Sequence, residues 1–126
     1  MADERVLIVE DNDKNMKLFR DVLAAKGYYT LEATTGEQAV ELAVQHRPDL
    51  VLLDIRLPGI DGVETLGRLR ADERTSSIPV LAVTAQAMRG DRERFLEAGF
   101  DGYVPKPVDV GVLVETVSEH CGRRAR

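Results

Sequence analysis

The sequence predicts an α/β fold, a (βα)5 doubly wound sheet of five parallel strands that alternate with helices. Short apolar runs rich in Val, Ile and Leu recur along the chain, amphipathic segments of helical length separate them, and helix-capping and glycine signals fall between the two. At 126 residues the chain has the length of one domain. We place that domain over 1–126, with a core of about 4–121 and a basic tail at 122–126.

The expected strands differ in how apolar they are. Residues 6–9, 50–53 and 80–83 are apolar throughout, whereas the runs at 28–33 and 103–104 are mixed. A parallel strand that is covered on both faces is a continuous apolar run, and a mixed strand suits an edge. We therefore place the apolar strands in the centre, which fits the strand order 2-1-3-4-5.

The expected helices are marked by periodicity and by their ends. Apolar side chains recur at helical spacing over 16–23 and over 109–121. Thr35 and Asp61 each stand three residues before a Gln or a Glu, which is the spacing of a capping box at a helix start. Two glycines stand where the first and fourth helices should end: Gly27 and Gly99.

Polar side chains follow the strands at their carboxyl ends. We expect the first strand to end in Glu10-Asp11, the third in Asp54 and the fourth in Thr84, and the fifth to lead into Lys106. In a sheet of this order, ligands bind at the carboxyl ends of the strands, so we expect these side chains to meet. Carboxylates that converge repel one another unless a cation offsets them. Because only oxygen donors are present, that cation should be Mg²⁺, with Mn²⁺ as a substitute.

Asp54 is the candidate nucleophile of this site. An ionised carboxylate can attack phosphorus without a general base, and phosphoryl transfer then needs positioning and charge neutralisation. Lys106 supplies a compact positive charge, and Thr84 supplies a hydroxyl donor. Each residue alone could be a helix start, a cap or a surface lysine, so their joint occurrence carries the prediction.

Pro107 directly follows Lys106. We expect the peptide bond between them to be cis, which would turn the Lys106 side chain back over the site. The alternative is a trans proline that only opens the last helix.

The composition argues against several classes of protein. A net charge of −5 disfavours binding to DNA through the overall field. A single cysteine, Cys121, excludes an internal disulfide framework and any metal site with several cysteines. The apolar run at 6–9 is far too short for a signal peptide or a membrane span. We therefore expect a cytoplasmic protein that binds neither DNA nor membranes.

The chain resembles the receiver domain of two-component response regulators, which has a CheY-like, flavodoxin-like fold. The matching stretches follow one another along essentially the whole chain: 6–12, 54–62, 79–85 and Lys106-Pro107. Residues 9–19 and 82–91 look closest to the stand-alone, DivK-like regulators.

The resemblance implies a bacterial phosphorelay protein with a defined set of site residues. Glu10 and Asp11 would hold Mg²⁺ together with Asp54 and the backbone carbonyl of Arg56. Asp54 would take its phosphoryl group from a phosphohistidine on a sensor kinase or a phosphotransfer protein. The chain would be a monomer or a dimer that forms on phosphorylation, and it would turn over no external substrate.

The resemblance also implies how phosphate changes the surface. Thr84 and Lys106 would bind the phosphoryl oxygens, and Tyr103 would turn inward when Thr84 moves. The fourth helical segment, 88–98, carries many charges and few apolar residues, so we expect it to be exposed and loosely held. The output would be a change in the surface of the fourth helix, the last strand and the last helix.

Two other functions stay open. A phosphatase with an aspartyl intermediate would use a second Asp two places after the nucleophile, where this chain has Arg56. A binding module with a vestigial switch would dock partners irrespective of phosphate. The intact set of site residues argues against that module.

Overall fold

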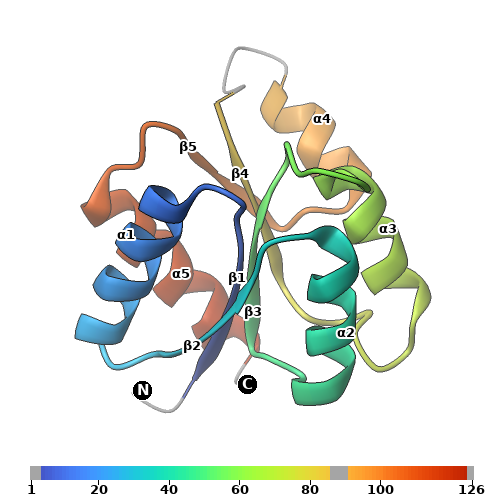
Figure 1. Cartoon of the computed structure of the whole chain (residues 1–126), viewed down its shortest axis with the longest axis horizontal. Helices are drawn as coiled ribbons and strands as arrows, with labels where there is room; N and C mark the ends of the chain where they lie inside the picture. The colour runs from blue at the N-terminus through green and yellow to red at the C-terminus, as the bar shows by residue number, and fades with distance from the viewer. Residues whose placement is uncertain (1–3, 86–90, 125–126) are drawn as a thin grey trace.

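The computed structural model describes residues 4–85 and 91–124, which form a five-stranded sheet with helices on both faces (Figure 1). The strands are β1 (Arg5–Val9), β2 (Tyr29–Ala33), β3 (Leu50–Asp54), β4 (Val80–Thr84) and β5 (Gly102–Pro105). The helices are α1 (Asp13–Ala25), α2 (Gly36–His46), α3 (Gly62–Ala71), α4 (Asp91–Ala98) and α5 (Val110–Arg124). All strand pairs are parallel and the order is β2-β1-β3-β4-β5, so the predicted topology is confirmed.

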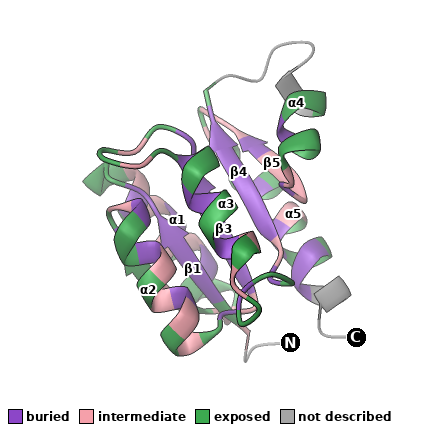
Figure 2. Ribbon diagram, turned by 90° about the vertical axis from the view of Figure 1, so that its right-hand side faces the viewer, coloured by how far each residue is buried: buried purple, intermediate pink, exposed green. Residues whose placement is uncertain are grey.

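The sheet separates two apolar clusters. One cluster lies between the sheet and α2, α3 and α4, and the other lies between the sheet and α1 and α5. The central strands β1, β3 and β4 are buried along almost their whole length, as Figure 2 shows, whereas β2 and β5 are only partly buried. This burial explains why the central strands are continuous apolar runs and the edges are mixed.

The third and fourth strands end in Asp54 and Thr84, as predicted, whereas the first strand ends at Val9, before Glu10. Asp54 pairs with Val83, and Thr84 pairs with Pro105, so both polar residues are the last residues of buried strands. The hydrogen-bond ladder between β4 and β5 continues past Thr84, whose carbonyl oxygen accepts from the Lys106 N–H at 2.8 Å. The sheet therefore delivers these polar side chains to one rim.

The predicted helix caps are present. The Thr35 side chain accepts from the Gln38 N–H at 3.1 Å, and Asp61 Oδ1 accepts from the Glu64 N–H at 2.9 Å. The Gln38 side chain accepts a hydrogen bond from the Thr34 N–H, whereas in a capping box it would accept from the N–H of Thr35. The two glycines expected at helix ends have positive φ angles, 93° at Gly27 and 113° at Gly99.

Helix α4 is exposed, as expected, but it is anchored. Residues 88–90 of the predicted segment lie outside the described residues, and the described helix begins at Asp91. Phe95 is buried and meets Phe100 edge to face, with ring centroids 6.0 Å apart. The expectation of a loosely held helix overlooked this aromatic pair, because a single apolar residue hardly registers in a charged segment. No helix in the described part of the chain is long and apolar enough to cross a membrane.

Arg47 ends α2 in the left-handed backbone region, with φ 48°. This region strains a residue that has a Cβ atom, whereas glycine adopts it freely. Arg47→Gly should therefore raise the free energy of unfolding by about 1 kcal/mol in urea denaturation. Lys26 at the end of α1 has φ −94°, so Lys26→Gly is the matched control and should not stabilise the protein. An equal gain in both variants would rule out backbone strain as the cause.

Candidate functional site

Three carboxylates meet at the carboxyl ends of the central strands. Glu10 and Asp11 follow β1 and Asp54 ends β3, and one carboxylate oxygen from each lies within 4.8 Å of the others. Glu10 is 1% exposed and Asp54 is 4% exposed, whereas Asp11 is open to solvent. The site is thus a buried acidic pair with a third, accessible carboxylate at its mouth.

Lys106 is the cation that the structure places against this acidic group. Its Nζ lies 3.3 Å from Asp54 Oδ2 and 3.3 Å from Glu10 Oε1. The contact with Asp54 follows the prediction, but the ion pair with Glu10 was not foreseen. The peptide bond between Lys106 and Pro107 is cis, as the sequence predicts, and Pro107 itself is exposed.

Backbone N–H groups also face the carboxylates. Glu10 Oε2 accepts from the Asn12 N–H at 3.2 Å, and Asp54 Oδ1 accepts from the Arg56 N–H at 3.2 Å. Glu10 Oε1 is buried and accepts no hydrogen bond, so its contact with Lys106 is electrostatic only. A buried carboxylate oxygen without a donor, in a cluster of oxygen ligands, fits a hard divalent cation.

The charge balance of the site is visible in Glu10. Burial and then the neighbouring Asp54 raise the pKa of the Glu10 carboxyl, while Lys106 and the Asn12 N–H act in the opposite direction. Lys106 and the Asn12 N–H therefore do not fully offset the effects of burial and of the Asp54 charge on Glu10. A bound divalent cation would stabilise the ionised form of Glu10.

Thr84 and Tyr103 lie on the two strands next to the acidic group. Thr84 is 3% exposed at the end of β4, and its carbonyl group is hydrogen-bonded to the backbone of Lys106. Tyr103 is half-buried on β5 and packs against the cluster that contains Phe95 and Phe100. The fold therefore joins Thr84 and Lys106 through the backbone, while Tyr103 faces the layer of α2, α3 and α4.

The close approach of α3 to the end of β3 depends on Gly62. The Gly62 N–H donates to the Ile55 carbonyl at 2.9 Å. A Cβ atom at Gly62 would lie 2.6 Å from the Asp54 carbonyl oxygen and 2.7 Å from Ile55 Cα. Only glycine fits there, so the first turn of α3 rests directly on the backbone that carries Asp54. The Arg56 side chain, which lies in the connection, is exposed.

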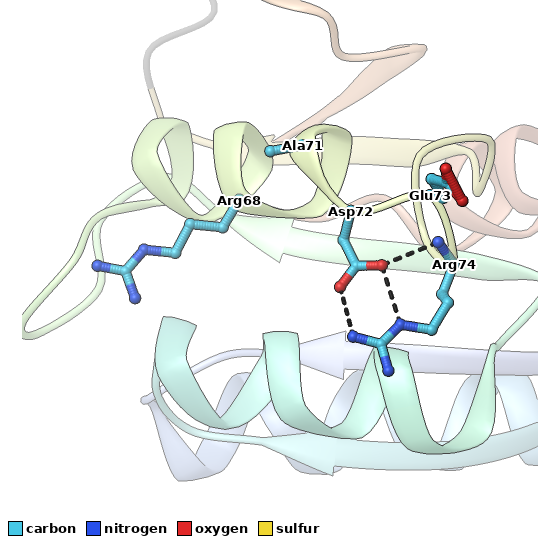
Figure 3. A pocket seen from close by; sticks show the side chains of 5 residues that line it. All are labelled: Arg68, Ala71, Asp72, Glu73 and Arg74. Atoms are coloured by element: carbon cyan, nitrogen blue, oxygen red, sulfur yellow. Dashed lines mark hydrogen bonds and ion pairs between the residues drawn. The ribbon is translucent and has the colours of Figure 1, made fainter.

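A shallow hollow at the other end of α3 carries no comparable chemistry. It is lined by Arg68, Ala71, Asp72, Glu73 and Arg74 (Figure 3). Asp72 and Arg74 bind each other at 2.8 Å, and the Arg74 guanidinium lowers the pKa of the Asp72 carboxyl to about 2. The two side chains of this partly exposed ion pair satisfy each other, so the hollow gives no indication of a ligand.

The comparison with known proteins decides the family. The model of the response regulator receiver domain matches residues 6–118. This chain belongs to the response regulator receiver family. In two-component signalling, a receiver accepts a phosphoryl group on an aspartate beside a Mg²⁺ site, and a histidine kinase is the donor. Receivers are generally not classical enzymes.

Individual relatives agree with this assignment. The receiver is 48% identical over 117 residues to the polar-differentiation response regulator DivK of Brucella anthropi. This alignment covers 93% of this chain and 95% of the relative. It is also similar to the receiver domain of the sensor histidine kinase PA1611 from Pseudomonas aeruginosa, solved with a magnesium ion coordinated in the active site cleft. That match has 36% identity, a TM-score of 0.88 and coverage of 96% and 99% of the two chains.

A more distant structure shows the fold alone. The chemotaxis response regulator CheY4 of Vibrio cholerae is 23% identical, with a TM-score of 0.87 over 93% of this receiver and 98% of that chain. The predicted CheY-like fold and DivK-like character are thus confirmed.

Proposed function

We propose that Asp54 is the phosphoacceptor of this receiver. The observation that carries the proposal is its position: a buried carboxylate that ends a central strand and lies close to Glu10, Asp11 and the Lys106 ammonium. Glu10, Asp11, Asp54 and the backbone carbonyl of Arg56 would hold Mg²⁺ or, as a substitute, Mn²⁺. When bound, the metal would supply charge neutralisation on the phosphoryl oxygens.

The proposed reaction is a single displacement at phosphorus. A carboxylate oxygen of Asp54 attacks the phosphohistidine of the donor, a P–O bond forms, the P–N bond breaks, and the leaving imidazole keeps the bonding electron pair. Lys106 and Thr84 would then bind the phosphoryl oxygens. The backbone hydrogen bond from Arg56 to Asp54 Oδ1 orients the carboxylate, which leaves Oδ2 on the side of Lys106.

The proposed output is a surface change. New partners for Thr84 and Lys106 would favour a second packing of β5 and its neighbours, with Tyr103 turning inward and Pro107 holding the connection after the lysine. We take residues 4–121 as the receiver core that carries this change. The phosphorylated state would alter the α4, β5 and α5 surface for a protein partner or for a second copy. The sequence also predicts that the protein lies in the cytoplasm and binds neither DNA nor membranes, and these statements stay predictions.

Phosphoryl transfer tests this function directly. Incubation with a phosphorylated histidine kinase or with acetyl phosphate and Mg²⁺ should add one phosphoryl group per chain, measured by intact mass. The receiver should lose that group slowly and should not turn over an added phosphoester. Many turnovers per chain would favour the phosphatase alternative instead.

Mg²⁺ binding should weaken as the pH falls, beginning at a higher pH than an ordinary glutamate would give. Mg²⁺ requires ionised Glu10, and burial together with Asp54 raises the pKa of that carboxyl, so protons compete with the metal. Calorimetric titration with MgCl₂ from about pH 8 to about pH 5 measures this dependence. In Glu10→Gln the affinity should be lower at neutral pH and its pH dependence flatter. A wild-type affinity that is constant over this range contradicts the assignment of Glu10.

A further inference from the structure

The starts of β4 and β5 are joined by Asp101, which directly precedes β5. The Asp101 N–H donates to the Val80 carbonyl at 2.8 Å, and Asp101 Oδ2 accepts from the Val80 N–H at 2.8 Å. Asp101 therefore binds both backbone groups of the first residue of β4. This double contact lies directly before the ladder of the two strands, whose first pair is Leu81 with Gly102.

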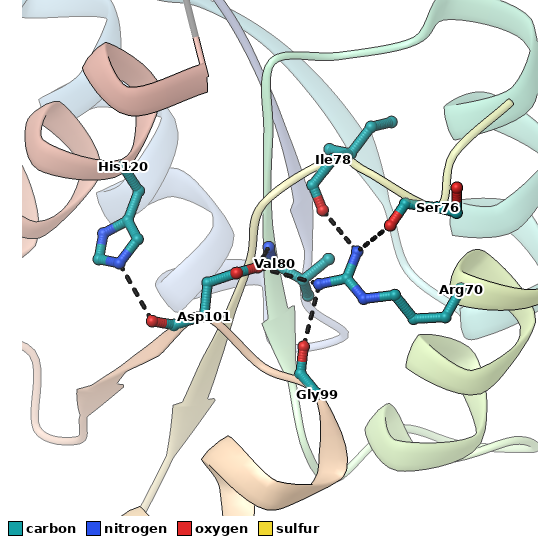
Figure 4. Close-up of polar contacts among 7 residues, drawn as sticks. All are labelled: Arg70, Ser76, Ile78, Val80, Gly99, Asp101 and His120. Atoms are coloured by element: carbon teal, nitrogen blue, oxygen red, sulfur yellow. Dashed lines mark hydrogen bonds and ion pairs between the residues drawn. The ribbon is translucent and has the colours of Figure 1, made fainter. Parts of the chain in front are cut away.

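Arg70 of α3 holds Asp101 in place (Figure 4). Its Nη2 donates to Asp101 Oδ2 at 2.9 Å and to the Gly99 carbonyl at 3.0 Å. Its Nη1 donates to the Ile78 carbonyl at 2.7 Å and to the Ser76 carbonyl at 3.1 Å. One planar guanidinium thus joins the end of α3 to the segments that lead into β4 and β5, a geometry that a lysine ammonium cannot reproduce.

The last helix joins the same group. His120 Nε2 lies 3.1 Å from the Asp101 carbonyl oxygen, and Nδ1 lies 2.8 Å from that of Thr116 (Figure 4 shows the Asp101 contact). Gly102 leaves room for this contact, because a Cβ atom there would lie 3.2 Å from the imidazole ring. We call Arg70, Asp101 and His120 the basal network. It lies at the starts of β4 and β5, whereas the acidic site lies at the carboxyl ends of the parallel strands.

The position of Lys106 depends on the register of β5. This edge strand has four residues, and among the described strands it pairs with β4 only. Its pairs run from Leu81 with Gly102 to Thr84 with Pro105, and the next hydrogen bond joins the Lys106 N–H to the Thr84 carbonyl. A slip by one residue would reverse the side chains of β5 and displace Lys106 Nζ from the carboxylates.

We propose that Arg70 and Asp101 are positioning residues, which hold β5 in register and thereby place Lys106 beside Asp54 and Glu10. The proposal rests on the proposed function only in that Lys106 binds the phosphoryl group. Glu10 and Asp11 follow β1 and Asp54 ends β3, and within the described residues the hydrogen bonds of the network go to neither strand. Loss of the network should therefore impair phosphoryl binding and leave the metal ligands in place.

Asp101→Ala tests this separation of effects. With saturating Mg²⁺, its affinity for beryllofluoride, which mimics a phosphoryl group on a carboxylate, should fall about tenfold to a hundredfold in ¹⁹F NMR titrations. Its affinity for Mg²⁺ alone should be unchanged or higher, because a displaced Lys106 ammonium no longer competes for Glu10 and Asp54. Asp101→Asn keeps an oxygen acceptor for the Val80 N–H and should recover most of the lost affinity.

Two further variants complete the test. Arg70→Lys keeps the positive charge but not the planar guanidinium. It should therefore bind beryllofluoride more weakly and Mg²⁺ as well as the wild type, with a smaller effect than Asp101→Ala. This variant replaces Asp101→Ala in the test if Asp101→Ala does not fold. Asp72→Ala removes a solvent-open pair at the same end of α3 (Figure 3) and should change neither affinity. Parallel loss of both affinities in Asp101→Ala and Arg70→Lys, or wild-type affinities in both, would overturn the proposal. A wild type that binds no beryllofluoride would contradict the proposed function instead.

Discussion

Asp54→Asn should lose phosphorylation by acetyl phosphate by about a thousandfold or more. The amide is neutral and a far poorer nucleophile than the carboxylate, and it also removes one of the three carboxylates that meet at the proposed metal site. Intact-mass measurement after incubation with acetyl phosphate and Mg²⁺ should show one added phosphoryl group in the wild type and none in the variant. Peptide mapping should place the wild-type modification on Asp54.

Asp61→Asn is the matched control for this change. Asp61 is exposed and caps α3 by accepting from the Glu64 N–H, a role that asparagine fills equally well. The same chemical substitution, a few residues away, should therefore leave phosphorylation at the wild-type rate. Equal labelling of Asp54→Asn and the wild type would show that another residue is the acceptor.

Gly62→Ala should lower the free energy of unfolding by about 3 kcal/mol. The new methyl group would lie 2.6 Å from the Asp54 carbonyl oxygen and 2.7 Å from Ile55 Cα. Both are backbone atoms at the end of β3, so no side chain can rotate to make room. Either α3 must move away from the sheet or the strand that carries Asp54 must shift. Urea denaturation followed by circular dichroism measures the loss.

Gly67 provides the comparison within the same helix. A Cβ atom at Gly67 would meet nothing within 4 Å, so Gly67→Ala should stabilise the protein by about 0.5–1 kcal/mol through helix propensity. The two substitutions are chemically identical and should act in opposite directions. If Gly62→Ala were neutral or stabilising, the close contact between α3 and the end of β3 would not be the constraint described above.

The prediction that succeeded best concerned the strands and the residues at their ends. Continuous apolar runs identify strands that are buried on both faces, and parallel strands bring their carboxyl ends to one rim. These two regularities suffice to bring Glu10, Asp11, Asp54 and Lys106 together, and the structure confirms that meeting. The ends of β3 at Asp54 and of β4 at Thr84 were predicted correctly. The first strand was expected to end in Glu10-Asp11, but it ends at Val9, because its pairing with both neighbouring strands stops there.

Other features have no local pattern in the sequence. Arg70 resembles any charged residue on an exposed helix, yet its guanidinium binds acceptors up to 31 residues away in the chain. Phe95 is one aromatic residue in a charged segment, and only its contact with Phe100 shows that it anchors α4. Such contacts depend on how helices pack against strands that are distant in sequence.

By itself, the sequence determined the parallel α/β fold, the strand order and the set of polar residues at the rim, because hydrophobic periodicity and strand direction are local properties. Only the tertiary structure decided that Lys106 lies between Glu10 and Asp54, that Glu10 keeps a buried oxygen without a hydrogen bond, and that α3 rests on the backbone of Asp54. These features depend on distances between separate elements. Packing determines those distances, and no single segment encodes them.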